Sequence, residues 1–322
     1  MENTKGKEMI RMTRLSNRDE GFSLIECMVS MGVMLFLMAS VFHVLGKYQR
    51  GYQNEQATTD MRQGARGAME LLSQEVGQAG YLGSTPTPRA LSASVTGSST
   101  NPQTVALSST ANLFPGEKLL VDTGAASEVV AVTSVSGTSV SGIFRKNHAQ
   151  NVPVNTAGVF AQGVLLPPAP GQPTPNQLQI FGDINGDGIL QYVEYTYDPA
   201  AGTLSRSITP YPNIAKGPAL VLLRNLQPNP GGTDFFQYYP LSDRLLTVYR
   251  TEVAVTATTQ TSSPDPDTNQ YRTMTSSLVL TARNVLSARN LVNIRVTDRI
   301  QSMTKTGSTC SWSILPAGFC TP

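Results

Sequence analysis

Oxygen-bearing side chains alternate with other residues in one short segment of the second half of the chain. The segment is Asp183-Ile184-Asn185-Gly186-Asp187-Gly188, and Glu194 follows it. This is the spacing of a twelve-residue calcium loop, with oxygen ligands on alternate positions and a glycine at position six for the sharp turn. The predicted ligands are Asp183, Asn185, Asp187, the backbone carbonyl of Ile189, and Glu194, with Gln191 acting directly or through water.

The flanking sequence does not supply the helices that usually hold such a loop. Gln179-Ile180-Phe181 and residues 192–197 both have the composition of strands. Glu194 would therefore have to reach the ion from a strand. The alternative is an ordinary turn with solvated carboxylates, so both interpretations stay open. Calcium is the one cofactor that the sequence suggests.

Other residue patterns offer little for catalysis. The chain has two histidines, His43 inside an apolar run and His148 beside Lys146 and Asn147. We expect His148 in a surface loop, because unclustered polar residues are mostly exposed. No Gly-x-Ser-x-Gly elbow, phosphate-binding loop, zinc-ligand cluster or haem-attachment motif is present. The sequence therefore predicts a protein that is not an enzyme.

Charge and composition restrict the partners. The formal net charge is +2, and no basic block carries interleaved aromatic residues, so no nucleic-acid partner is expected. Charged residues make up 14% of the chain, against about 25% in typical soluble proteins. This composition suits an extracellular, β-rich surface.

Two cysteines lie near the C-terminus. Cys310 and Cys320 have nine residues between them. In an oxidising compartment we expect them to pair, and closing this loop would stabilise the fold by roughly 3 kcal/mol through the unfolded chain. Two free thiols in a cytosolic protein are the alternative.

The N-terminus joins a basic leader to an apolar segment. Residues 1–21 are polar and mostly basic, and no charged residue lies between Cys27 and Phe42. A helix over residues 22–45 would reach about 36 Å, which spans a bilayer core of roughly 30 Å with some tilt. The basic side should stay in the cytoplasm. Glu26 lies inside the apolar segment, where a carboxylate is costly and usually functional.

These residues resemble a known processing signal. Gly21-Phe22-Ser23-Leu24-Ile25-Glu26 closely resembles the signature of type IV pilins and pseudopilins. The resemblance implies cleavage by prepilin peptidase after Gly21 and N-methylation of Phe22. It also implies that Glu26 pairs with the free amino group of Phe22 on a neighbouring subunit. Many major pilins have a proline where His43 stands, so a more continuous helix is expected here.

The helix should continue beyond the membrane to residue 80. Small and apolar residues recur at steps of three and four, which predicts one buried stripe. The stripe consists of Met61, Ala65, Ala68, Met69, Leu72, Val76 and Ala79. Glu70 and Glu75 fall largely off it, and Gly80 is the expected C′ residue.

The helix and one later segment resemble the PilW family of minor pilins. The resemblance is carried by Arg66–Leu72, by Gln78–Gly83, and by Leu278–Asn284, which resembles the closing strand of that family with its Arg-Asn pair. The first quarter of the chain resembles the family strongly and the rest in patches.

The remaining residues, 81–322, should form an exported β-rich head. Residues 84–112 are expected to be a loop or a loosely packed region, and residues 113–160 a small subdomain of short strands. Residues 167–175 are expected to be a Pro-rich extended linker or surface loop. A hairpin is expected over residues 192–206. Further strands are expected at Ala219–Leu223, Leu245–Ala257 and Thr273–Ala282. The predicted fold class is α+β, with a long N-terminal helix packed on a mainly antiparallel head.

The leading functional prediction is a non-catalytic minor pilin in the tip or priming complex of a type IV pilus. It would sit in the inner membrane as a single-pass protein with its head in the periplasm, and then join the pilus at the cell surface. Its partners would be prepilin peptidase, other minor and major pilins, and the membrane. The alternatives are a pseudopilin of type II secretion and a calcium-stabilised tip adhesin or binding module.

Overall fold

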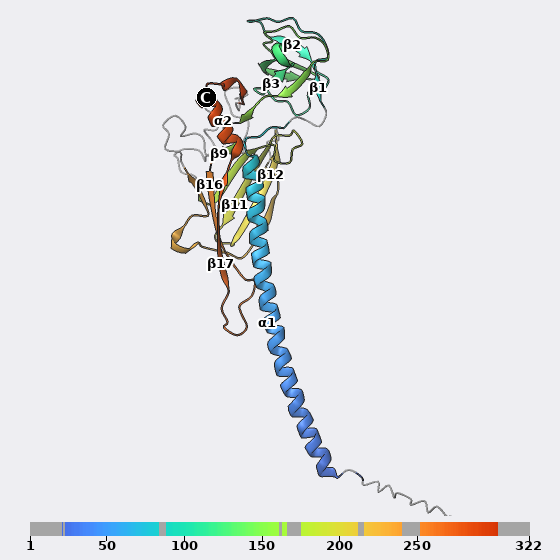
Figure 1. The fold of residues 1–322 in the computed structure, drawn as a ribbon, viewed down its shortest axis with the longest axis vertical. Coiled ribbons are helices and arrows are strands. Elements are labelled where there is room, and N and C mark those ends of the chain that lie inside the picture. The colour runs from blue at the N-terminus through green and yellow to red at the C-terminus, as the bar shows by residue number, and fades with distance from the viewer. Residues whose placement is uncertain are drawn as a thin grey trace, which may run out of the picture. The chain divides into compact units, whose positions relative to one another are not determined.

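A computed structural model describes residues 21, 23–83, 88–160, 163–165, 175–211, 216–239 and 252–301. Its longest element is α1 (Leu24–Gln78), a helix of 55 residues (Figure 1). The helix runs through His43 without interruption, as expected for a segment that lacks proline. The chain divides into two compact units, residues 1–55 and residues 56–322, which are described separately below.

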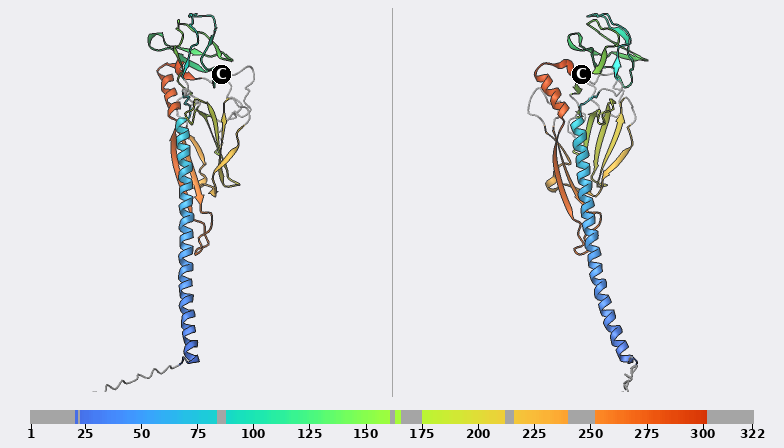
Figure 2. Two further views of the ribbon diagram at one scale, coloured as in Figure 1. Left: turned by 90° about the vertical axis from the view of Figure 1, so that its right-hand side faces the viewer. Right: turned by 45° about the vertical axis from the view of Figure 1, so that its right-hand side comes forward.

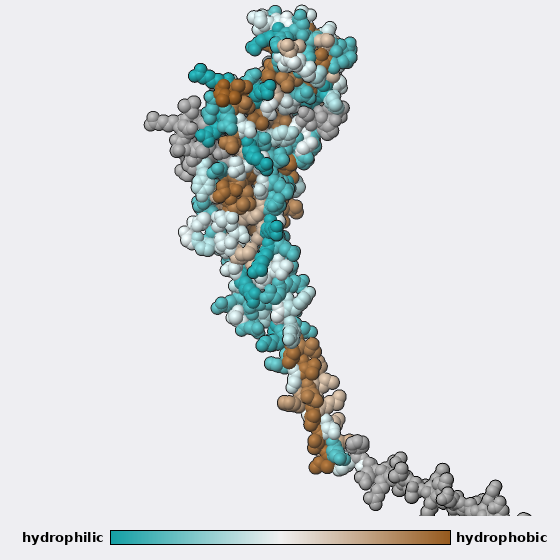
Figure 3. Space-filling view, in the orientation of Figure 1, coloured by the Kyte–Doolittle hydropathy of each residue, from teal (hydrophilic) through white to brown (hydrophobic). Residues whose placement is uncertain are grey.

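The described part of the first unit consists mainly of exposed apolar side chains. Every residue from Leu24 to Leu45 is exposed, and Figure 3 shows this part of α1 as a largely brown segment. Leu24 is 80% exposed and Phe36 is 74% exposed. Among the described residues, α1 is the one helix long and apolar enough to cross a membrane. Such a surface requires lipid or other helices around it.

The part of α1 in the second unit buries one stripe. Its buried residues are Thr58, Ala65, Ala68, Met69, Leu72, Glu75 and Val76. The predicted stripe is confirmed from Ala65 onward, and Figure 2 shows this part of α1 alongside the strands on both sides of it. The helix ends at Gln78, and Gly80 has a φ of +80°. A Cβ on Gly80 would lie 2.6 Å from the carbonyl oxygen of Phe160, so glycine is required there.

A five-stranded antiparallel sheet packs its apolar residues into the same core as the stripe. Its order is β13-β12-β11-β10-β9. The strands are β9 (Val164–Leu165), β10 (Gln177–Gly182), β11 (Gln191–Asp198), β12 (Thr203–Pro210) and β13 (Ala219–Leu223). The predicted hairpin of residues 192–206 is confirmed as β11 and β12. The Asp198 carboxylate accepts hydrogen bonds from the backbone N–H groups of Ala200 and Ala201, which fixes the turn.

A second antiparallel sheet contributes the other side of this core. Its strands are β14 (Leu226–Gln227), β15 (Phe236–Tyr239), β16 (Glu252–Gln260) and β17 (Thr273–Thr281). β16 pairs with β14 and β15 and with β17. The predicted strand at Thr273–Ala282 is confirmed. The predicted strand at Leu245–Ala257 is confirmed from Glu252, and residues 245–251 lie outside the described part of the chain.

The expectation that Leu278–Asn284 is one closing strand is wrong at its end. The strand stops at Thr281, and α2 (Arg283–Asn293) follows. Val285 and Ala288, three residues apart, are buried on one face of α2. That helical spacing outweighs the strand character of the preceding Leu-Val-Leu.

The expectation that residues 84–112 form a loop or a loosely packed region is wrong in part where the structure describes them, from residue 88. Strands β1 (Arg89–Ala90) and β2 (Gln103–Ala106) lie there. Leu91, Val95 and Val105 are buried in a core shared with the predicted subdomain. The core between the two small sheets is itself small, so the few apolar residues of this segment are enough to fill their part of it.

We call residues 88–160 the outer sheets. Their remaining strands are β3 (Lys118–Val121), β4 (Glu128–Ala131), β5 (Ser134–Ser136), β6 (Ser139–Gly142), β7 (Pro153–Thr156) and β8 (Val159–Phe160), with a 3₁₀ turn, η1 (Gly124–Ala126). One sheet has the order β1-β7-β3-β4 and the other β2-β6-β5. β8 instead pairs in parallel with β18 (Ile300–Gln301).

The Gln301 side chain adds to the β8–β18 pairing that holds the C-terminal described residues on the outer sheets. The Gln301 amide oxygen accepts a hydrogen bond from the Lys118 N–H at 2.8 Å. Its NH₂ group donates to the carbonyl oxygens of Lys118, at 2.8 Å, and Ala157. Two further 3₁₀ turns, η2 (Pro230–Gly232) and η3 (Thr297–Arg299), complete the described elements. Most of the predicted linker at 167–175 lies outside them.

Candidate functional site

The predicted processing segment leads directly into the first turn of α1. Gly21 is exposed, and Phe22 lies outside the described residues. The backbone N–H of Ser23 donates a hydrogen bond to Glu26 Oε2 at 3.1 Å. The N–H of Cys27 donates to the carbonyl of Ser23 at 3.2 Å. Ser23 and Glu26 thus occupy the N-cap and N3 positions of a capping box. Of its two bonds, the one present is that from the N-cap N–H to the Glu26 carboxylate.

This cap was visible in the sequence as Ser-x-x-Glu and was not predicted. It gives Glu26 a local role before any subunit contact, because its carboxylate satisfies one of the free N–H groups at the start of α1. The second oxygen retains its acceptor capacity. Glu26 is therefore held at the start of the apolar segment, in a position to accept a further cation.

The head has a buried ion pair that the sequence pattern missed. Glu75 was expected off the stripe, but its side chain is 6% exposed and that of Arg206 is 16% exposed. Arg206 Nε donates to Glu75 Oε2 at 3.0 Å, and Arg206 Nη2 and Tyr195 Oη also donate to this carboxylate. The bonds join α1 to β11 and β12. We call Glu75, Arg206 and Tyr195 the helix clamp.

The environment of the clamp is consistent with a charged pair. Burial, followed by the Glu75 charge, raises the pKa of Tyr195, so its hydroxyl stays a donor. Burial would lower the pKa of Arg206, but the hydrogen bond and charge of Glu75 outweigh it and raise that pKa. The helix is therefore held to the sheet by two charge-assisted bonds and a neutral donor.

The Arg283-Asn284 pair contacts the C-terminal end of α1. Asn284 Nδ2 donates to the carbonyl of Gly77 at 3.2 Å. The Arg283 guanidinium lies so close that a Cβ on Gly77 would be 3.4 Å from its Nη2. A donor and a cation at a helix C-terminus satisfy its free carbonyls and its dipole. The pair therefore caps α1.

In the predicted calcium loop, Asp183 is engaged by the backbone. Asp183 is 1% exposed. Its Oδ1 accepts from the N–H groups of Gly186, at 2.8 Å, and Asp187, at 3.1 Å. Its Oδ2 accepts from Gly188, at 2.8 Å, and Gly83, at 3.2 Å. The carboxylate thus closes its own loop and ties it to the end of α1.

The other predicted ligands are directed to different partners. Glu194 pairs with the Lys216 ammonium and accepts from Tyr192 Oη at 2.7 Å. Burial would raise the pKa of Glu194, but the bonds from Lys216 and Tyr192 hold it below its ordinary value. Asn185 Nδ2 donates to Asp187 Oδ2 at 2.8 Å, and the Ile189 N–H donates to Asp187 Oδ1 at 2.8 Å.

Within the described residues, no three His, Cys, Asp or Glu side chains gather as a metal-binding group. As they lie, Asp183, Asn185, Asp187, Ile189 and Glu194 do not fit the predicted ligand arrangement. Calcium binding after a rearrangement of Glu194 stays a prediction. Cys310 and Cys320 lie outside the described residues, so their pairing also stays a prediction.

The expectation that His148 lies on the surface is wrong. It is 3% exposed. Its Nδ1 lies 3.1 Å from Asp122 Oδ2, and its Nε2 lies 2.7 Å from Glu128 Oε1. Glu128 also accepts the backbone N–H groups of Arg145 and Lys146. Local spacing gives no signal for this triad, because strand pairing brings distant residues together.

The outer sheets also bury a carboxyl group without an ion-pair partner in the part of the chain described. Glu117 is 1% exposed, and burial raises its pKa to about 7, although the Arg89 charge lowers it in part. Thr156 Oγ1 donates to Glu117 Oε1 at 3.0 Å. Arg89 instead donates to the carbonyl of Ala111 at 2.6 Å. No local pattern of residues indicates this burial.

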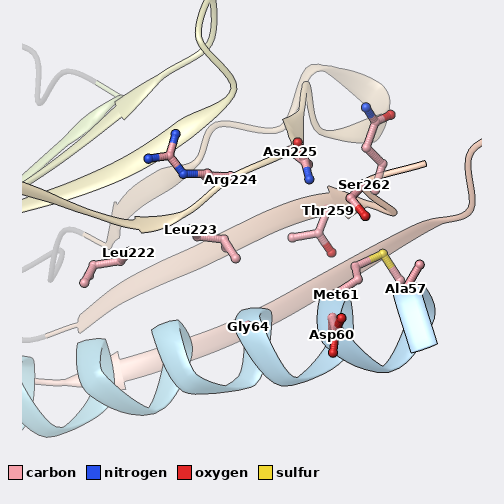
Figure 4. A pocket seen from close by; sticks show the side chains of 11 residues that line it. Ala57, Asp60, Met61, Gly64, Leu222, Leu223, Arg224, Asn225, Thr259 and Ser262 are labelled. Atoms are coloured by element: carbon pink, nitrogen blue, oxygen red, sulfur yellow. The ribbon is translucent and has the colours of Figure 1, made fainter. Parts of the chain in front are cut away.

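A groove of about 240 Å³ lies between α1 and the ends of β13 and β16 (Figure 4). Asp60, Met61 and Gly64 line it from α1, and Leu222 and Arg224 line it from the opposite wall. Its lining residues include one acidic and one basic side chain but no histidine or cysteine.

Comparison with known proteins supports the N-terminal signal. Residues 16–42 match the family model described as the prokaryotic N-terminal methylation motif. No curated protein matches the chain. The matched segment contains Gly21, Phe22 and Glu26 and continues into the exposed part of α1. The motif implies processing by prepilin peptidase and anchoring in the inner membrane. The chain thus carries the N-terminal signal of type IV pilins and pseudopilins.

Proposed function

We propose that this protein is a non-catalytic minor pilin that takes part in type IV pilus assembly, within a tip or priming complex. The observation that carries the proposal is the continuity of the methylation motif with α1. The processing signal is followed in the sequence by one unbroken helix, which bears an exposed apolar segment and a stripe that forms part of the head core.

Assembly would use Phe22 and Glu26. Cleavage after Gly21 leaves a cationic amino group on Phe22 at the start of the apolar segment. The Ser23 N–H holds the Glu26 carboxylate in the first turn of α1, four residues after Phe22 in the sequence. A carboxylate in hydrocarbon needs a cation, and stranding one partner of such a pair typically costs about 3–5 kcal/mol. The amino group of a neighbouring subunit supplies that cation.

The helix clamp would transmit force between α1 and the head. Two charge-assisted bonds from Arg206 and one from Tyr195 hold Glu75 on β11 and β12. Arg283 and Asn284 hold the last turn. A subunit drawn out of a membrane by its helix needs such a connection. The likeness of Arg66–Leu72 and Gln78–Gly83 to PilW proteins supports the minor-pilin role.

A type II secretion pseudopilin is the second candidate, because the methylation motif serves pilins and pseudopilins alike. Neighbouring genes separate the two: pilus motor and minor-pilin genes support the first, and secretion genes the second. A tip adhesin would combine assembly with binding by the head, and binding of glycans or cells by the displayed head would support it.

The test is the intact mass of the full-length protein recovered from its host. The wild type should lack residues 1–21 and carry one methyl group on Phe22. The Gly21→Val variant should keep the leader. Gly32→Ala is the matched control, because a Cβ on Gly32 has no atom within 4 Å, and this variant should be processed normally. An uncut wild type, or one cut near Ala39-Ser40, contradicts the proposal.

Assembly is tested separately with Glu26→Gln. This variant should be cleaved, because Gly21 is intact, and should be depleted from sheared filaments at least tenfold. Glu70→Gln, an exposed carboxylate later in α1, should enter filaments normally. Normal incorporation of the Glu26→Gln variant into filaments would contradict the proposed role of the Glu26 carboxylate in assembly.

A further inference from the structure

Two tyrosines and two cations follow the apolar part of α1. Tyr48 is 74% exposed and Tyr52 is 72% exposed. They lie with Gln49 and Gln53 along a shallow groove on the helix surface. Lys47 and Arg50 flank them, and no other Lys, Arg, Asp or Glu lies between Glu26 and Glu55. The segment therefore combines aromatic rings with a local charge of +2.

The tyrosines continue the apolar face of the helix. Tyr48 lies three residues after Leu45 and seven after Val41, and Tyr52 lies four residues after Tyr48. Residues at these spacings share one helix face. The face thus changes from aliphatic to aromatic side chains with polar tips at the point where charged residues reappear.

The position along the helix matches the edge of a bilayer. Tyr48 lies about 36 Å and Tyr52 about 42 Å beyond Leu24, at 1.5 Å per residue. The hydrocarbon core is roughly 30 Å thick, and the headgroup layers extend it to roughly 40–45 Å. With Leu24 at the inner boundary of the hydrocarbon core, Tyr48 falls in the outer headgroup layer. Tyr52 lies at the water side of that layer, and its side chain tilts back toward the membrane, as side chains of a helix tilt toward its N-terminus.

The side chains suit that layer chemically. Tyrosine is enriched at membrane interfaces because its ring is apolar and its hydroxyl is polar. Lysine and arginine place their stems on apolar surface and their charge among phosphates. Arg50 Nε donates to the carbonyl of Gly46 at 3.2 Å, so its side chain turns back toward the apolar segment.

We propose that Lys47, Tyr48, Arg50 and Tyr52 form an interfacial anchor that binds phospholipid headgroups at the outer surface of the inner membrane. This 47–52 anchor rests on the proposed function, which places α1 in that membrane. It sets the depth of α1 and therefore the depth of Glu26 before assembly. Extraction into a filament removes the anchor from the headgroups.

The test uses tryptophan fluorescence in vesicles of phosphatidylethanolamine and phosphatidylglycerol brominated at defined acyl positions. The chain has one tryptophan, Trp312, so a Trp312→Phe background accepts single reporters in the full-length protein. Tyr48→Trp reports on the anchor, and Phe36→Trp, about 18 Å beyond Leu24, reports on the bilayer centre. Tyr271→Trp, 49% exposed in the head, reports on solvent.

Quenching of Tyr48→Trp should be strongest with the shallowest bromines, and quenching of Phe36→Trp with the deepest. Adding Tyr48→Ala and Tyr52→Ala to the Phe36→Trp protein should move its quenching maximum by at least one bromine position. The matched pair Gln49→Ala and Gln53→Ala, from the same groove, should leave it in place. Tyr271→Trp should not be quenched by any of these lipids.

The contrary outcomes are distinct. Deep quenching of Phe36→Trp without shallow quenching of Tyr48→Trp overturns the anchor and leaves membrane insertion intact. No quenching of Phe36→Trp at any depth overturns both the anchor and the insertion that the proposed function requires. A third outcome is that, at high protein-to-lipid ratio, Tyr48→Trp is no longer quenched while a chemical crosslinker joins copies of the protein. The face that carries Tyr48 and Tyr52 is then covered by a neighbouring helix, and this outcome overturns the headgroup proposal.

Discussion

The sheets that pack on α1 and the outer sheets bury their carboxyl groups differently. Glu75 meets Arg206 and Tyr195 directly, so its charge is compensated inside the core. Glu117 has a hydroxyl donor, Thr156, and only the more distant charge of Arg89. The first arrangement holds α1 on the sheet through an ion pair. The second makes the outer sheets the part of the head whose stability should respond to pH.

The largest effect should come from breaking the helix clamp. Arg206→Leu leaves the Glu75 carboxylate buried with Tyr195 alone, and stranding one partner of a buried pair typically costs about 3–5 kcal/mol. Urea unfolding of the full-length protein in detergent measures this cost. Adding Glu75→Leu should recover most of the loss, because an apolar pair of similar volume is often neutral.

Arg145→Leu is the control, since this exposed arginine should change stability by no more than about 0.5 kcal/mol. A cost below about 1 kcal/mol for Arg206→Leu would mean that the clamp does not hold the helix. The contrast between the two sheet systems would then disappear.

Ionisation of Glu117 should have the next largest effect on stability, and the effect should appear as the pH rises above about 4.5. Its folded pKa is about 7 and its ordinary value is 4.5. The folded state therefore resists ionisation. Stability is fully present below about pH 4.5, decreases as the pH rises, and levels off above about pH 7. One pKa unit corresponds to about 1.4 kcal/mol, so the total is about 3.5 kcal/mol.

Glu117→Gln should remove this pH dependence. The variant and the wild type should unfold at similar urea concentrations at pH 5, and the variant should be the more stable at pH 8. Glu252→Gln, which alters an exposed carboxylate of β16, should track the wild type at both values. A pH-independent difference between Glu117→Gln and the wild type would contradict the assignment.

His148 provides a smaller test within the outer sheets. His148→Leu removes the contacts of both ring nitrogens with Asp122 and Glu128. Leaving a buried acceptor without its partner costs about 1–3 kcal/mol. Thermal unfolding should show the loss, and it should be independent of Arg206→Leu because the two sites share no contact. Strong coupling between these variants would show that the clamp and the outer sheets form one cooperative network.

The sequence predicted what depends on local spacing. The α1 stripe follows from residues three and four apart, and the β11–β12 hairpin follows from alternation around Asp198-Pro199. The sites missed depend on pairing at a distance. Glu75 is 131 residues from Arg206, and His148 is 26 residues from Asp122. A charged residue at a buried helix position has no sequence signature until its partner is known.

The same reason limits the calcium prediction. The ligand spacing in residues 183–194 is local, and the sequence identified it. The partner that competes for Glu194 is Lys216, beyond the loop, and no spacing rule includes it. For Asp183 the competitors are backbone N–H groups, which every sequence supplies. Correct spacing is therefore necessary for such a site and does not determine where the carboxylates point.

The smallest expected effect is that of calcium on the Asp183 loop. The ligand spacing predicts that calcium stabilises the head, and mass action gives RT ln(1 + [Ca]/Kd). Because Glu194 must first leave Lys216, the gain should be smaller than the effects above, about 1 kcal/mol or less at millimolar calcium for a weak site.

Melting temperatures of the full-length protein in calcium and in chelator measure this gain in stability. A rise that Glu194→Gln abolishes and Glu128→Gln preserves supports the prediction. Equal melting temperatures contradict the calcium prediction and leave Asp183 as the cap of its own loop. Asp183 and Glu194, like Glu75, would then have only partners from the protein itself.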